Sequence, residues 1–145
     1  MPLKQYSRIR WGRVVAAAVM SEVLVVAVLI LITTAHRFLI APGGTAAEYQ
    51  AFSDLAGYYV APAGAGLAVF AGALWVGRKL TSGFISNGTL VGVVAVLLTG
   101  GLFFVAKPED RLMYGVSFVL RIVGGYVGGI AAQRTFSRRA SAVLQ

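Results

Sequence analysis

The stretch Val14–Thr34, VVAAAVMSEVLVVAVLILITT, decides the fold of this chain. It is almost wholly apolar over the ~20 residues that a helix needs to cross a hydrocarbon core of about 30 Å. One residue breaks the pattern, because Glu22 stands in the middle of the run. An ionised group in hydrocarbon costs at least ~2.5–3.5 kcal/mol, so such a residue usually faces a partner, a cavity or a ligand.

Three further apolar runs follow along the chain. They are Gly57–Gly77, Thr89–Ala106 and Leu112–Gln133, and the last has Arg121 in its middle. Backbone polar groups must be satisfied inside a bilayer, so these runs are interpreted as helices. The alternating pattern of a membrane β-barrel is missing. The sequence therefore predicts an all-α integral membrane protein, with residues 1–140 forming a single domain built as a four-transmembrane-helix bundle.

The composition agrees with a chain that is solvated mainly by lipid. Hydrophobic residues make up 58% and charged residues 12%, and the mean hydropathy is +0.79. A soluble domain carries roughly 25% charged residues. The net charge is +8, but the cations lie at the ends of apolar runs rather than on a soluble face, so no nucleic-acid partner is expected. The chain has no cysteine, which excludes disulfides and thiolate metal sites.

The distribution of Lys and Arg predicts the orientation in the membrane. Cytoplasmic loops carry an excess of these residues. The two termini and the loop between the second and third spans are basic, whereas the other two loops carry few cations and most of the acids. The first group is Lys4, Arg8, Arg10, Arg13, Arg78, Lys79, Arg134, Arg138 and Arg139, and the second is Arg37, Lys107 and Arg111. We therefore expect both termini in the cytoplasm, and the cytoplasmic (inner) membrane of a prokaryote as the location.

The longest segment outside the predicted spans is the external loop 35–56. Thr45 and Glu48 match a helix capping box, in which each side chain satisfies a free backbone N–H of the other residue. A helix is therefore predicted from about Ala46, either continuing into the second span with a kink at Pro62 or lying at the interface. The C-terminal residues 141–145, SAVLQ, resemble a cut viral main-protease site. They are interpreted as a remnant of tag removal, and no function is assigned to them.

Glu22 and Arg121 form the centre of the predicted bundle. Counted from the nearest span ends at 1.5 Å per residue, both lie at nearly the same depth, on antiparallel helices. A direct pair is therefore geometrically allowed. Polar and small residues follow Arg121 at helical spacing on one face, and Ser21 stands beside Glu22. The residues that share the face of Arg121 are Tyr114, Ser117, Gly124 and Gly128.

Glycines recur at four-residue spacing, which lets helices approach closely in lipid. The fourth span has two overlapping pairs, Gly124 with Gly128 and Gly125 with Gly129, and the second span has a run from Gly64 to Gly72. These spacings favour packing within the bundle. Because two glycine faces on one helix cannot both meet one neighbour, a homodimer is the other interpretation.

The segment Ala18–Val23, AVMSEV, is similar to the first span of small multidrug resistance transporters. That resemblance implies that Glu22 would exchange protons for cationic drugs. The chain departs from the family in its long first loop, in Arg121, and in lacking an aromatic-rich third span. A cation beside Glu22 would repel a cationic substrate, so the chain is not assigned to this family.

Two classes of function follow from these features, and catalysis is not one of them, because no catalytic constellation is present. The first is a non-catalytic scaffold or accessory subunit in which Glu22 and Arg121 fix the bundle, with a second copy or a partner membrane subunit bound to it. The second is a small proton- or ion-coupled transporter or channel that uses Glu22 and Arg121.

Overall fold

The computed structural model describes residues 9–142, with side chains as far as Ser137. Side chains outside the described residues include those of the predicted remnant at 141–145 and of the cations Lys4, Arg8, Arg138 and Arg139. Within this range the chain is all-helical, and four of its helices are long and apolar enough to cross a membrane. This confirms the prediction of a four-helix architecture.

The helices are longer than the apolar runs that predicted them. They are α1 (Trp11–Ala35), α2 (Ala46–Gly77), α3 (Phe84–Val105) and α4 (Arg111–Ala142), and a π-helical turn, η1 (His36–Ile40), extends α1. α3 begins five residues before the predicted Thr89. Gly83, with φ of 70°, adopts the left-handed conformation that starts it.

The loop expected between the first two spans is mostly helical. α2 begins at Ala46 with the capping box in place: the Glu48 amide donates to Thr45 Oγ1 at 3.3 Å, and the Thr45 amide donates to Glu48 Oε2 at 2.7 Å. The helix then continues without interruption through the buried Pro62 to Gly77. The alternative of a separate interfacial helix is therefore wrong.

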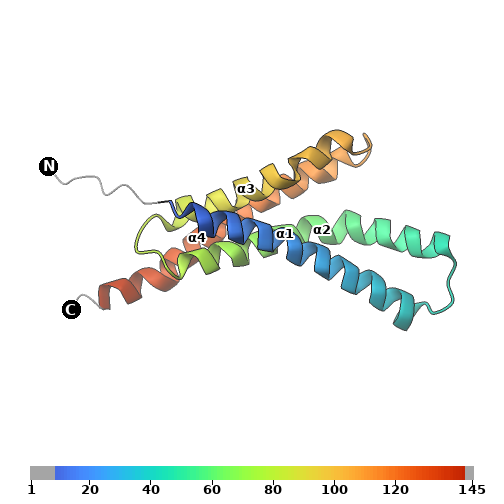
Figure 1. The fold of residues 1–145 in the computed structure, drawn as a ribbon, viewed down its shortest axis with the longest axis horizontal. Helices are drawn as coiled ribbons and strands as arrows, with labels where there is room; N and C mark the ends of the chain where they lie inside the picture. The colour runs from blue at the N-terminus through green and yellow to red at the C-terminus, as the bar shows by residue number, and fades with distance from the viewer. Residues whose placement is uncertain (1–8, 143–145) are drawn as a thin grey trace.

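The bundle consists of two helical hairpins that cross (Figure 1). α1 and α2 form one hairpin, and α3 and α4 form the other. The start of α1, loop 78–83 and the end of α4 lie at one end, here called the terminal end. The hairpins diverge toward the opposite end, which carries loops 41–45 and 106–110. α4 packs against α2 and α3, and α1 packs against the same two helices, so α1 and α4 have little direct contact.

The core lies where the hairpins cross and is built from small residues. Val14, Val69, Val76 and Val91 are fully buried there, together with several alanines. Many large apolar side chains point outward instead, and Leu31, Phe104 and Leu112 are 68%, 80% and 73% exposed. The outer surface of the bundle is therefore apolar along most of its length.

Candidate functional site

The candidate site is an ion pair that spans the bundle from α1 to α4. Arg121 Nε donates to Glu22 Oε1 and Nη2 donates to Oε2, both at 2.8 Å. The side chains are only 8% and 20% exposed, respectively. Two parallel bonds between a guanidinium and a carboxylate form the strongest common ion-pair geometry. The structure thus confirms the buried ion pair that the sequence predicted.

The third guanidinium nitrogen of Arg121 donates within its own helix. Nη1 donates to the hydroxyl of Ser117, one turn earlier in α4, which is itself buried. The guanidinium therefore bonds through all three of its nitrogens. Tyr114, a further turn away on the same face, is half-buried, and within residues 9–142 its hydroxyl makes no hydrogen bond. The polar centre thus consists of Glu22, Arg121 and Ser117, without Tyr114.

Ser21 stands next to Glu22 in sequence but serves a different contact. Its hydroxyl lies 2.7 Å from the carbonyl of Ala17 in its own helix and 3.1 Å from the carbonyl of Ala68 in α2. A Cβ added to Gly72 would lie 3.0 Å from this hydroxyl. Ser21 and Gly72 therefore hold α1 close to α2, and so help to fix the depth of Glu22.

The two glycine faces of α4 meet two different helices of the same chain. Gly124 and Gly128 lie against the backbone of α2, where a Cβ added to Gly128 would come within 2.7 Å of the Phe70 carbonyl. Gly125 and Gly129 lie against α3, where a Cβ on Gly129 would lie 2.8 Å from Ile85 Cα. The two glycine faces that suggested a homodimer thus make their contacts with helices of the same chain.

Two further glycines bring α4 to its place beside the ion pair. A Cβ added to Gly92 of α3 would collide with the carbonyl of Arg121 itself. A Cβ on Gly66 of α2 would lie 3.2 Å from the carbonyl of Leu120. Gly64, which the sequence grouped with Gly72, has nothing within 4 Å of an added Cβ. On α2, Gly72 of the predicted run approaches α1, whereas Gly66, which that run does not include, approaches α4.

Asn87 is a buried polar residue that the sequence analysis missed. It is fully buried near the start of α3. Its Oδ1 accepts from the amide of Arg10, and its Nδ2 donates to the carbonyl of Gly83, both at 2.9 Å. It therefore ties the start of α1 to the start of α3. The sequence signal was a polar amide directly before an apolar run. It was missed because the third span was predicted to begin at Thr89, after Asn87.

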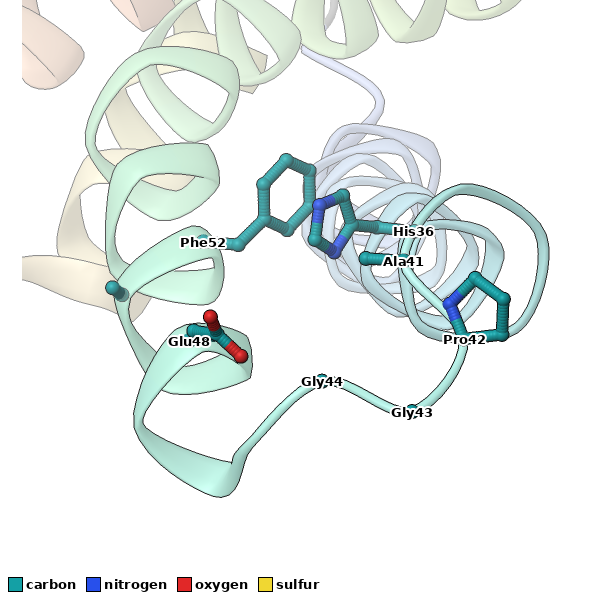
Figure 2. Close-up of a pocket in the computed structure, with 8 residues that line it drawn as sticks. His36, Ala41, Pro42, Gly43, Gly44, Glu48 and Phe52 are labelled. Atoms are coloured by element: carbon teal, nitrogen blue, oxygen red, sulfur yellow. The ribbon is translucent and has the colours of Figure 1, made fainter.

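A cavity of about 630 Å³ opens at the end opposite the terminal end, between η1 and the first turns of α2. Figure 2 shows His36 and Phe52 face to face beside the loop Pro42–Gly44, with Glu48 at the rim. The two rings are 3.6 Å apart and nearly parallel. Neither Glu22 nor Arg121 lines this cavity, so it is separate from the ion pair.

No family model matches the chain, and comparisons with curated proteins and with solved structures likewise find no match.

Proposed function

We propose that this chain is an integral membrane protein that acts as a non-catalytic scaffold or accessory subunit, with its bundle fixed by Glu22 and Arg121. The observation that carries the proposal is that both carboxylate oxygens and all three guanidinium nitrogens of the pair are hydrogen-bonded. Both carboxylate oxygens of Glu22 accept from Arg121, and the third nitrogen of Arg121 bonds to Ser117. A carboxylate held by a neighbouring guanidinium is a poor carrier of protons or cations, because releasing either group leaves a buried charge unpaired.

The outer surface supports insertion into a bilayer. Soluble proteins rarely expose apolar patches larger than a few hundred Å². Here large apolar side chains are exposed along every helix, among them Leu24, Leu67, Leu97 and Val119, at 51%, 71%, 73% and 60%. Within residues 9–137, the four buried polar side chains Ser21, Asn87, Ser117 and Arg121 all have hydrogen-bond partners, as a membrane interior requires. We infer that lipid, or the apolar surface of a second copy or partner membrane subunit, covers these side chains.

The charge distribution supports an orientation with both termini in the cytoplasm, in the inner membrane of a prokaryote. Among the described residues, Arg10, Arg13, Arg78, Lys79 and Arg134 gather at the terminal end. Glu48, Asp54, Glu109 and Asp110 lie toward the other end with Arg37, Lys107 and Arg111. The positive-inside rule then assigns the terminal end to the cytoplasm.

The absence of cysteine from the sequence provides a direct test of this topology. Ser82→Cys would label the loop at the terminal end, and Pro42→Cys the loop at the other end; both positions are exposed. In intact cells, a membrane-impermeant maleimide should label only the cysteine at position 42, and disruption of the membrane should expose the one at 82. Labelling of position 82 in intact cells would overturn the orientation. Extraction of the protein from membranes by alkaline carbonate would overturn the insertion.

Reconstitution into proteoliposomes tests the scaffold against the transport alternative. The scaffold predicts no proton, ion or drug flux by the wild-type protein under an imposed proton gradient, and co-isolation of a second copy or membrane partner after cross-linking. Flux that is present in the wild type and lost in a folded Glu22→Gln variant would overturn the proposal and establish transport. Glu109→Gln removes the same charge at an exposed position and is the matched control for an effect of charge alone.

A further inference from the structure

A groove at the terminal end lies apart from the ion pair and has no role in the scaffold described above. It has a volume of about 550 Å³ and lies between the first turn of α3 and the last turns of α4. Its lining residues are Ile85, Ile130, Gln133, Arg134 and Ser137.

Helix geometry explains why the groove forms at this place. The four lining residues of α4 stand at positions i, i+3, i+4 and i+7, so they share the face that meets α3. Gly129 lets the two backbones touch at Ile85, where an added Cβ would lie 2.8 Å from Ile85 Cα. α3 begins at Phe84, whereas α4 continues past Gln133. The part of this α4 face that extends beyond the start of α3 therefore has no helix opposite it.

The groove combines a cation with an apolar wall. Arg134 is exposed, and its guanidinium has no hydrogen bond or ion pair among the side chains that the structure describes. Ile85 and Ile130 supply apolar surface beside it. None of the five acidic side chains of the chain lies at this end, so nothing among them competes for Arg134. Arg78 and Lys79, in the loop at the same end of the bundle, add to the positive potential.

We propose that this groove binds the phosphate headgroup of an anionic phospholipid, with the phosphate on Arg134 and an acyl chain along Ile85 and Ile130. A guanidinium forms two parallel hydrogen bonds to a phosphate, which gives both strength and orientation. Basic pockets between helices at the cytoplasmic face suit such headgroups. A free phosphate would share the polar contact but would leave the apolar wall uncovered. The inference rests on the proposed membrane insertion.

The test measures lipid binding by the full chain in nanodiscs. Phosphatidylglycerol is titrated into phosphatidylcholine discs, and inorganic phosphate is added to phosphatidylcholine discs in a parallel arm. Retained lipid is counted by native mass spectrometry, and the midpoint of thermal unfolding is followed. Arg134→Gln removes the proposed contact. Lys79→Gln removes the same charge at the same end but outside the groove, and both side chains are exposed, so both variants should fold.

We expect the wild type and Lys79→Gln to retain phosphatidylglycerol and to unfold at a higher temperature with it. Arg134→Gln should bind it about tenfold more weakly or worse, as loss of a charge-assisted hydrogen bond implies. Equal loss in both variants would show a general charge effect and overturn the site. Stabilisation by inorganic phosphate alone would overturn the lipid assignment. A protein that inserts into the discs but shows no lipid preference refutes only this inference, whereas failure to insert refutes the proposed function.

Discussion

Breaking the Glu22–Arg121 pair from one side should cost far more than removing both partners. In Glu22→Leu, Arg121 stays 8% exposed and loses both of its bonds to the carboxylate. Removing one partner of a buried pair costs about 3–5 kcal/mol, because the other charge is left uncompensated. Arg121→Met should also destabilise the bundle, by at least about 2 kcal/mol, because the Glu22 carboxylate loses its partner at a depth where its surroundings are apolar.

The double variant Glu22→Leu/Arg121→Met carries no unpaired charge. Replacing a buried ion pair by apolar residues of similar volume is often neutral or stabilising. Ser117 would lose its partner, but a serine in a helix can donate to the carbonyl of its own preceding turn. We therefore expect the double variant to lie within about 1 kcal/mol of the wild type. The coupling energy between the two sites would then be at least ~4 kcal/mol, above the ~0.5–3 kcal/mol usual for residues in direct contact.

Unfolding by SDS in mixed micelles can measure this cycle. Trp11 and Trp75 are 55% and 46% exposed and report on the environment of α1 and α2 by fluorescence. Lys79→Met, at an exposed position, is the control and should change the free energy of unfolding by less than about 0.5 kcal/mol. A coupling energy below about 1 kcal/mol, or a double variant as unstable as the sum of the singles, would refute the structural role of the pair.

Three further changes test contacts that hold the helices together at other points of the bundle. Gly92→Ala should destabilise the bundle by several kcal/mol or prevent folding, because the added Cβ would collide with a backbone carbonyl of α4. In the same SDS titration, the control Gly64→Ala should be neutral or stabilising by up to about 1 kcal/mol, because nothing lies near its added Cβ. Asn87→Ala should cost about 1–3 kcal/mol through loss of two buried hydrogen bonds, with Ser86→Ala as the exposed control. Thr45→Ala should cost about 1 kcal/mol and increase amide exchange in the first turn of α2 only.

The sequence could predict the two residues of the site that differ most from their apolar surroundings. A Glu and an Arg in long apolar runs stand out at once, and the fixed rise of a helix places them at equal depth. Ser21 and Ser117 were found as neighbours at helical spacing, but their separate roles were not. Ser117 completes the guanidinium, while Ser21 joins α1 to α2. Helical periodicity gives the face of a residue but not the partner that this face meets.

The glycine spacing likewise predicts which face of a helix packs closely, but not which helix it meets. Four-residue spacing marks the α4 glycines as candidates for close approach to other helices, yet it cannot say whether the partner is one helix, two helices or another copy. Two neighbouring helices of the same chain fill both faces. On α2 the spacing includes Gly64, which meets no other helix, and Gly72, which approaches α1, but it omits Gly66, which approaches α4. That choice depends on the rotation of α2 about its axis, which contacts with other helices set.

The sequence by itself determined that this chain forms four long apolar helices with two opposite charges at one depth, because length, hydropathy and helical rise are local properties. It also determined the start of α2, since a capping box is complete within four residues. The tertiary structure alone decided that α1 and α4, which share little backbone contact, are joined through Glu22 and Arg121. It did so because Gly66, Gly92 and Gly124 let α2 and α3 approach α4 closely enough for one long side chain to reach across the bundle.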